Sequence, residues 1–379
     1  MLDDESSYAC YAATENQSQG RIYNEAKPNF RGEYQRDRDR IIHSSAFRRL
    51  VYKTQVFVNH EGDLYRTRLT HSIEVSQISR TIAQALSLNE TLIEAIALAH
   101  DLGHTPFGHA GQDTLNKCMH SEGGFEHNYQ SLRVVDQLEA KYAQFDGLNL
   151  TFETREGILK HCSARNARNL GLIGERFLNR TQPSLEAQLV NIADAIAYNH
   201  HDIDDGVRAG LLCFEQLNEI SLFRKSFDSI KLKFPHSDEK RLLHESLRHM
   251  INAVINDLII NTKLMLNDLN PKSIRDIRKN NLVTAKFSDG LEIEHIKMKQ
   301  FLNSNLYKHA KVTEMTERAE TMIIKIFESY ASNEKSLPES FNRIYRDTKK
   351  ANKLRAICDY IAGMTDRFAI AEYERLVEL

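Results

Sequence analysis

The sequence predicts an all-α protein, and three observations carry that prediction. Its 379 residues include only 16 glycines and six prolines, which is few for a turn-rich β fold. From about residue 71 onward, apolar residues recur mostly at helical spacing. Strand-like alternation is scarce, with short candidates only at residues 51–58 and 282–287.

The composition is that of an ordinary globular protein. Hydrophobic residues make up 41% and charged residues 27%, which argues against wholesale disorder, and a net charge of −2 argues against a DNA-wrapping protein. No apolar run approaches the roughly 18 residues of a membrane span, and the acidic start is no signal peptide. The five scattered cysteines form no CxxC pair and fit free thiols. We therefore expect a cytoplasmic protein without a membrane partner.

Charge and periodicity divide the chain into three parts. Residues 1–30 hold five acidic and two basic residues and form a polar lead-in. Residues 31–215 open with a basic segment, with nine arginines and lysines against five acids in residues 31–71, and continue as helices. Residues 216–379 form a helical extension that we expect to pack on the preceding part. Its helices break near four points: Pro235, Asn270-Pro271, Ser288-Asp289-Gly290 and Pro338.

The first helix of interest places a histidine on an apolar stripe. Thr70 can cap this helix, and His71 then falls on one face with four apolar residues. These are Val75, Ile78, Ile82 and Leu86. A lone inward histidine is more often a hydrogen-bonded core residue than a ligand, so a role for His71 depends on partners.

The second helix leads into a segment with an unusual density of imidazoles. It is predicted from Asn89 to His100 and ends in the adjacent pair His100-Asp101. In the next ten residues three glycines and one proline stop the helix and hold His104 and His109 on a tight loop. Imidazoles at this density indicate an active-site wall.

The third element, predicted over residues 184–199, carries an isolated acid. Ser184 caps it, Asp194 and Tyr198 share one face, and Asp202 continues that face just past the helix. Asp194 lies among apolar neighbours, where a carboxylate is costly unless it is paired or bound to a cation. Taken alone, Asp194 fits a buried salt bridge equally well.

Together, two histidines and two aspartates predict a metal site: His71, His100, Asp101 and Asp194. This nitrogen and oxygen donor set suits a divalent ion, with Mn²⁺ or Mg²⁺ expected and Fe²⁺, Co²⁺, Ni²⁺ or Zn²⁺ as alternatives. Four protein ligands leave positions for water on a six-coordinate ion, which could then activate water and polarise a phosphoryl oxygen.

An ordered series of motifs resembles the HD superfamily of metal-dependent phosphohydrolases, and most closely its deoxynucleoside triphosphate triphosphohydrolase branch, the dGTPase-like proteins. The motifs lie at residues 38–50, 53–56, 68–72, 100–111, 124–128, 198–206, 305–309 and 359–367. The series spans nearly the whole chain and is far more specific than the HD dipeptide. The resemblance implies an HD-domain helical bundle, with residues 31–215 as the phosphohydrolase core and residues 216–379 as additional C-terminal helices.

The resemblance also implies a reaction. A dNTP, dGTP or another, would be cleaved between the α-phosphorus and the deoxyribose 5′ oxygen, which gives a deoxynucleoside and intact triphosphate. The metal ligands would be the four residues of the predicted site. Three further histidines would line the α-phosphate and handle protons, because an imidazole titrates near working pH: His104, His109 and His127.

Four other residues would bind the substrate. Gln55 and Asp202 would hydrogen-bond the sugar 3′-hydroxyl, Tyr198 would pack where a ribonucleotide carries its 2′-hydroxyl, and Arg68 would meet a phosphate. The resemblance further implies a homo-oligomer, often a hexamer, and in some relatives a second dNTP as activator. We expect the other histidines, His201 among them, to be structural or surface residues.

One departure from the family pattern opens an alternative. Three residues past His109, where relatives usually carry an acid, this chain has Gln112. An amide can hold an imidazole by a hydrogen bond but cannot stabilise an imidazolium as a carboxylate does, although Glu126 or Glu122 could substitute. The alternative is therefore a catalytically weakened dNTP sensor or a protein that binds single-stranded nucleic acid, through basic residues between 343 and 355.

Overall fold

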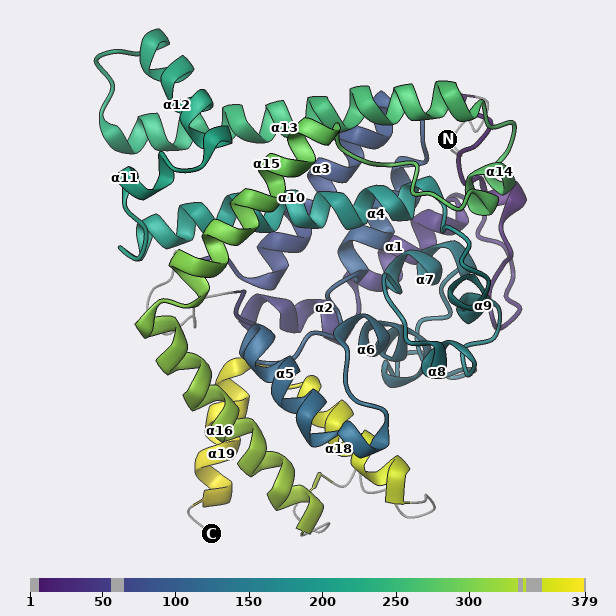
Figure 1. Ribbon diagram of the computed structural model, residues 1–379. Helices are drawn as coiled ribbons and strands as arrows, with labels where there is room; N and C mark the ends of the chain where they lie inside the picture. Colours follow the sequence, from purple (N-terminus) through teal and green to yellow (C-terminus); the bar gives the residue numbers. More distant parts are fainter. Residues whose placement is uncertain (1–6, 56–64, 333–336, 339–349, 378–379) are drawn as a thin grey trace.

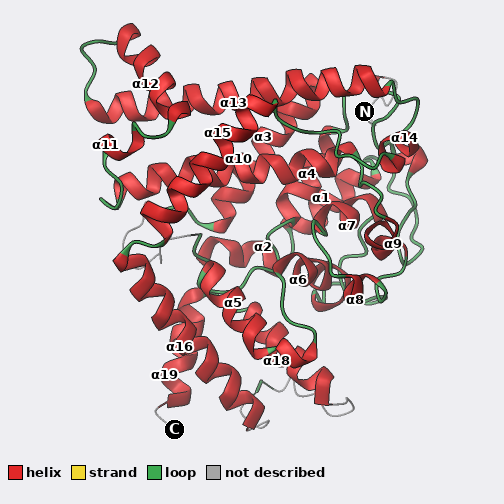
Figure 2. Cartoon of the chain, viewed as in Figure 1, coloured by secondary structure: helices red, strands yellow, loops and turns green. Residues whose placement is uncertain are grey.

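The computed structural model describes residues 7–55, 65–332, 337–338 and 350–377. Within these ranges every regular element is a helix, and no strand is present apart from isolated bridges (Figure 2). The predicted all-α fold is confirmed. No described helix is long and apolar enough to cross a membrane.

The first half of the chain forms the helices that surround the predicted metal site. They are α1 (Glu33–Ile42), α2 (Ser45–Arg49), α3 (Arg68–Ala85), α4 (Glu90–Ala99), α5 (Gly108–Cys118), α6 (His127–Arg133), α7 (Phe152–Ile158), α8 (Ala164–Ala167), α9 (Leu172–Asn179) and α10 (Leu185–Arg208). At their centre, α3, α4 and α10 bury one apolar cluster, to which α13 (Glu239–Leu269) adds Val254 and Leu258 from above (Figure 1). Burial of this shared core fixes the three site-bearing helices relative to one another.

The second half forms a long helix and a separate C-terminal group. Its elements are α11 (Phe214–Leu217), α12 (Ser221–Lys233), α13, α14 (Ile274–Lys279), α15 (Asp289–Leu302), α16 (Ala310–Ser332), α18 (Lys350–Ala362) and α19 (Asp366–Val377). Helices α16, α18 and α19 gather around α5 in the lower part of Figure 1. Their shared core joins Leu115 of α5 and Met119, which caps the end of α5, to Ile323 of α16 and Ile357 of α18.

Capping explains where the site helices begin, and it corrects one expectation. The cap of helix α3 is Thr67 and not Thr70, so the helix starts two residues before the predicted cap. The Thr67 hydroxyl accepts from the Thr70 N–H, and the Thr70 hydroxyl accepts from the Thr67 N–H. Asn89 caps α4 and Ser184 caps α10, as predicted. Helix α10 continues to Arg208, however, so Asp202 lies inside the helix and not just past it.

The two candidate strands are not strands. Residues 50–52 form a short 3₁₀ helix, Thr54 makes an isolated bridge with Thr67, and residues 56–58 lie outside the described residues. Residues 282–287 form a loop between α14 and α15. A short alternating run in the sequence does not by itself distinguish such segments from strands.

The described part of the polar lead-in packs on the helical core. Ala12 and Ala13 are buried in the main apolar cluster. The Arg21 guanidinium pairs with Asp37 and Glu33 of α1, and its Nη1 also donates to the Asn149 carbonyl. Its polar residues therefore serve largely as partners for buried groups of the core.

Candidate active site

Three helices bring the four predicted metal ligands together. His71 lies on α3, His100 and Asp101 follow α4, and Asp194 lies on α10. The Nε2 atom of His71 is 2.9 Å from Asp194 Oδ1. The Nε2 atom of His100 is 3.4 Å from Asp101 Oδ1 and 3.6 Å from Asp194 Oδ1. Two imidazole nitrogens and two carboxylates therefore point at a common position.

The hydrogen bonds of His100 suit a metal ligand. Its Nδ1 lies 2.6 Å from the Ala97 carbonyl, so Nδ1 carries the proton and Nε2 keeps its lone pair. That Nε2 is buried and has no hydrogen-bond partner among the described residues. Burial opposes ionisation of Asp101, but His100 and Arg68 nevertheless hold the pKa of Asp101 well below its usual range. The cluster is consistent with binding of a divalent metal ion.

Asp194 has a second partner that the sequence did not suggest. The Lys160 ammonium, which follows α7, contacts Asp194 Oδ2. Despite burial, the Lys160 ammonium and the neighbouring His100 ring hold the pKa of Asp194 well below its usual range. Lys160 stands in no recognisable motif, so only the folded arrangement identifies it.

The three predicted catalytic histidines lie side by side next to the metal cluster. The ring centroids of His104 and His127 are 4.8 Å apart in a stacked pair, and those of His104 and His109 are 5.7 Å apart. Burial lowers the pKa of all three rings. The pKa of His104 falls well below its usual value, that of His109 falls below it, and that of His127 falls to about 3. Asp113, beside His109, opposes that shift.

A strained turn places His109 at the start of α5. Phe107 and Gly108 both have left-handed backbone conformations, with φ of 60° and 59°. A Cβ on Gly108 would lie 3.0 Å from the Gln55 carbonyl oxygen, so glycine permits this close approach of the two chain segments. The Phe107 N–H donates to Asp366 Oδ1 at 3.0 Å, and this bond helps hold the turn.

Gln112 is the hydrogen-bond partner of His127. Its Oε1 lies 2.5 Å from His127 Nδ1 and also accepts from the His127 backbone N–H at 3.3 Å. The imidazole proton is therefore on Nδ1, which leaves the Nε2 lone pair available. Glu126 is engaged elsewhere, because its carboxylate caps α6 by accepting from the Asn128 and Tyr129 N–H groups.

The predicted substrate-binding residues also gather around the metal cluster. Arg68 Nη1 lies 2.8 Å from Asp101 Oδ2, while its Nε and Nη2 have no hydrogen-bond partner among the described residues. Gln55 Oε1 and Asp202 Oδ1 are likewise buried and make no hydrogen bond within the described part of the chain, although Asp202 Oδ1 lies 3.5 Å from His201 Nε2. The Tyr307 hydroxyl donates to Asp202 Oδ2, and burial raises the pKa of Asp202 to about 8.

These residues open onto one cavity of about 730 Å³, a volume typical of small-molecule sites. Of the eleven predicted site residues, only His100 and Asp202 do not line it directly. Another wall of the cavity comes from the second half of the chain. The sequence did not predict its residues as part of the site: Lys299, Asn303, Tyr307, Val312 and Thr316. Tyr307 lies within one of the quoted motifs, whereas Lys299 carried no signal in the sequence.

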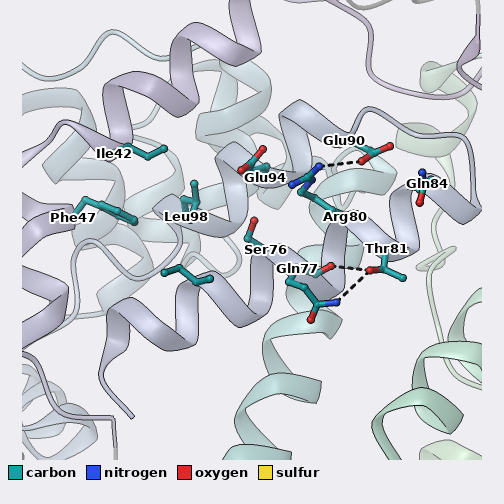
Figure 3. Close-up of a pocket in the computed structure, with 11 residues that line it drawn as sticks. Ile42, Phe47, Ser76, Gln77, Arg80, Thr81, Gln84, Glu90, Glu94 and Leu98 are labelled. Carbon is teal, nitrogen blue, oxygen red and sulfur yellow. Dashed lines mark hydrogen bonds and ion pairs between the residues drawn. The ribbon is translucent and has the colours of Figure 1, made fainter. Parts of the chain in front are cut away.

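Two other hollows differ in their relation to this cavity. One of about 420 Å³ shares Asn191, Ala195 and Lys299 with it and adds Lys160, Arg176 and Lys286 to its lining. The other, of about 570 Å³, lies among α1, α2, α3 and α4 (Figure 3). There Arg80 pairs with Glu90 at 3.5 Å and Gln77 bonds Thr81, so these polar groups satisfy one another. None of the eleven predicted site residues lines this groove.

Comparison with known proteins decides the family. The HD domain model matches residues 68–199, and the model for the phosphohydrolase-associated domain matches residues 285–375. Over 375 residues the chain is 54% identical to a deoxyguanosinetriphosphate triphosphohydrolase-like protein of Bordetella pertussis, with 98% of this chain and 96% of the relative covered. The chain belongs to this family. Proteins with the same description in Thiobacillus denitrificans and Nitrosomonas europaea are 54% and 52% identical, with 98% of both chains covered in each case.

The residues that line the cavity of this HD-domain phosphohydrolase come from both matched regions. The HD domain match contains all four residues of the metal cluster, the three histidines, Arg68 and Tyr198. The associated-domain match contains Lys299, Tyr307 and Asp366. In this dGTPase-like protein the cavity therefore draws on both regions.

Proposed function

We propose that this HD-domain protein hydrolyses dNTPs to deoxynucleoside and triphosphate with the help of a divalent metal ion. The observation that carries the proposal is the cavity itself. His71, Asp101 and Asp194 line it and His100 completes their cluster, while its lining also holds groups without hydrogen-bond partners among the described residues, of the kind that a deoxyribose and a phosphate chain require. The relatives are described as deoxyguanosinetriphosphate triphosphohydrolase-like proteins, which supports the same substrate class.

The four cluster residues would hold the ion, with Mn²⁺ or Mg²⁺ foremost and Fe²⁺, Co²⁺, Ni²⁺ or Zn²⁺ as alternatives. When bound, such an ion stabilises negative charge on a phosphoryl oxygen and lowers the pKa of water. Arg68, with two guanidinium nitrogens left unpartnered among the described residues, would bind the α-phosphate. Its anchoring to Asp101 would fix the phosphate relative to the cluster.

His109 and His127 would move the protons of the reaction. The 5′ oxygen of the leaving deoxynucleoside needs a proton, and we assign its delivery to His109: burial and Arg68 lower the pKa of His109, and Asp113 partly offsets them. His127, with its proton fixed on Nδ1 by Gln112, offers a lone pair on Nε2. His104, stacked on His127, would complete the lining around the α-phosphate.

The sugar and the distal phosphates would lie against opposite walls. Gln55 and Asp202 each have a buried oxygen that makes no hydrogen bond within the described residues, and together they would bind the 3′-hydroxyl. Tyr198 would exclude a 2′-hydroxyl. The adjoining hollow, with Lys160, Arg176 and Lys286 in its lining, offers positive charge for the β- and γ-phosphates.

The alternative of a weakened dNTP sensor or nucleic-acid-binding protein rests on Gln112. The hydrogen bond to His127 favours the enzyme, because the amide still orients the imidazole. Replacement of Gln112 by Glu separates the two: a large gain in turnover would support an impaired enzyme, and no change would mean that the amide is tolerated. Of the basic residues between 343 and 355, Arg343, Arg346 and Lys349 lie outside the described residues, and Arg355 already donates to the Gly124 carbonyl.

We also propose a cytoplasmic homo-oligomer, with a hexamer as the expected form, in which a second dNTP can act as activator. This part of the proposal is supported by the family membership alone. It is tested by the mass of the protein in solution with and without dNTP.

The reaction is tested by incubating each of the four dNTPs with the protein and Mn²⁺ and separating the products by ion exchange. Triphosphate and deoxynucleoside in equal amounts are expected. Pyrophosphate or orthophosphate in place of triphosphate would contradict the proposed bond cleavage. Ribonucleoside triphosphates and 2′,3′-dideoxynucleoside triphosphates serve as controls, and both should react at least tenfold more slowly, because each disturbs a contact of Tyr198 or of Gln55 and Asp202.

A further inference from the structure

The two histidines of the metal cluster differ in what supports their rings. His100 donates its Nδ1 proton to the Ala97 carbonyl at 2.6 Å. The Nδ1 of His71 is buried and has no hydrogen-bond partner among the described residues. A metal-ligating histidine almost always donates its second N–H to a carbonyl, a carboxylate or water, because that bond fixes the tautomer and the ring orientation. His71 therefore lacks a support that His100 has.

The ring of His201 is placed to supply that support. His201 lies on α10, where it is buried, and its ring centroid is 5.0 Å from that of His71, with the planes at 84°. One nitrogen of each ring and one carboxylate oxygen of Glu74 all lie within 4.8 Å of one another. The Nε2 of His201 also makes no hydrogen bond within the described part of the chain, and it lies 3.5 Å from Asp202 Oδ1. Two buried nitrogens without a hydrogen bond thus belong to neighbouring rings.

The tautomer of His201 follows from its other neighbour. His201 Nδ1 lies 3.0 Å from Glu74 Oε2, and Arg66 Nε lies 2.9 Å from Glu74 Oε1. Because the Arg66 guanidinium pairs with it, Glu74 is a carboxylate and can only accept. The His201 proton is therefore on Nδ1, and its Nε2 can accept a hydrogen bond.

We propose that His201 is a positioning residue for His71. In the metal-bound protein the Nδ1–H of His71 donates to Nε2 of His201, whose own Nδ1–H donates to Glu74, which Arg66 holds in place. This chain of contacts leaves the Nε2 lone pair of His71 directed at the metal position. It assigns a role to a histidine that sequence reasoning placed among structural or surface residues.

The inference rests on the proposed metal site but not on the nucleotide reaction, so it is tested by metal binding alone. The full-length protein is stripped of metal and titrated with Mn²⁺ by calorimetry, without nucleotide. His201→Phe keeps a ring in the space but removes the acceptor, and we expect it to weaken the Mn²⁺ Kd by roughly 10- to 100-fold. His201→Gln keeps a carbonyl acceptor and should restore most of that affinity.

His200→Phe is the matched control. His200 is the neighbouring residue on α10 and is equally buried. Among the described residues its one hydrogen bond goes to the Ile196 carbonyl, so its replacement should leave the Kd unchanged. If His201→Phe does not fold by circular dichroism, Glu74→Gln takes its place, because loss of the carboxylate should weaken Mn²⁺ binding in the same direction.

Three results would overturn the proposal. An unchanged Kd in folded His201→Phe would show that His71 needs no such partner. Two Mn²⁺ ions per wild-type chain, with the second lost in His201→Phe, would instead make Glu74 and His201 ligands of a second ion. Absence of Mn²⁺ binding by the wild-type protein would overturn the metal site and this inference with it, whatever the nucleotide assay shows.

Discussion

The two sides of the cavity are built in different ways. The metal side consists of side chains on α3, α4 and α10, which share one apolar core and lie within the HD domain match. The substrate side consists of irregular segments around Gln55 and Phe107 that the C-terminal helices hold in place. The comparison teaches that the residues of the proposed metal site all lie within the HD domain match, whereas the segments of the proposed substrate side are held by contacts from the associated-domain match.

The corner between α18 and α19 makes the contacts that hold the substrate side. Asp366 accepts from the Thr54 N–H at 2.9 Å and from the Phe107 N–H at 3.0 Å, so it ties together the segments that carry Gln55 and His109. The buried Lys53 ammonium donates to the His104 carbonyl at 2.5 Å and to the Ala362 carbonyl at 2.7 Å. Because no ion pair to Lys53 is present within the described residues, these two carbonyl groups hold its side chain.

The largest effect is expected from the metal side. Asp194→Asn keeps the shape of the side chain but removes the charge that faces both histidines and Lys160. Because the metal ion supplies several kcal/mol of transition-state stabilisation, we expect triphosphate release to fall about a thousandfold or more. The measurement pairs turnover with Mn²⁺ calorimetry, and both should fall together. Full activity in this variant would remove Asp194 from the site.

A smaller and different effect is expected from the substrate side. Asp366→Asn replaces one accepting oxygen by an amide that cannot accept, so either Thr54 or Phe107 loses its bond. We expect kcat to fall about 10- to 100-fold through misplacement of the segments, with the Mn²⁺ Kd unchanged.

Glu372→Gln provides the control for Asp366→Asn. Glu372 is a buried carboxylate on the same helix, but its bonds go to Tyr330 and Arg375, away from the cavity. It should lower stability without lowering kcat. If Asp366→Asn weakened Mn²⁺ binding as strongly as it lowered kcat, the two sides would not be separable.

The smallest expected effect is a pH dependence of the free energy of unfolding, and it comes from two histidines that are not among the proposed metal ligands, His200 and His295. Burial lowers the pKa of His200 and of His295 to about 4, against about 6.5 in the unfolded chain. Below pH 6.5 the unfolded chain takes up protons that the folded protein refuses. The free energy of unfolding should therefore fall as pH drops from 6.5 to 4, by about 1.4 kcal/mol per pH unit for each histidine.

Denaturant unfolding at pH 7.5 and 5.5 checks this for the wild type and for His295→Gln, which can still accept from Asn199. The variant should lose part of the pH dependence and keep its Mn²⁺ affinity at pH 7.5. The same pH dependence in both proteins would show that His295 is not held neutral.

The same comparison explains how much the sequence could predict. The fold class and the helices of the metal side were predictable, because helical spacing and caps such as Asn89 and Ser184 are local signals. The ends of these helices were less predictable. The third helix was expected to end at residue 199, before Asp202, but no helix-breaking residue stands there and α10 continues to Arg208. Convergence of His71, His100, Asp101 and Asp194 could be proposed only because four unusual residues stood on helices.

The partners of those residues could not be predicted in this way. Lys160, His201 and Asp366 act through contacts between segments 34 to more than 300 positions apart in the chain, as with Lys160 and Asp194 or Asp366 and Thr54. Such contacts depend on how helices pack and leave no periodic pattern. Gln112 was noticed from the sequence, but its partner, His127, was known only from the fold.

The central claim is that water attacks the α-phosphorus of a dNTP held between these two sides. Hydrolysis in ¹⁸O-labelled water with Mn²⁺, followed by mass spectrometry of both products, tests it most directly. The account predicts one ¹⁸O atom in the triphosphate and none in the deoxynucleoside. Label in the deoxynucleoside 5′-hydroxyl would mean cleavage of the carbon–oxygen bond and would contradict the account.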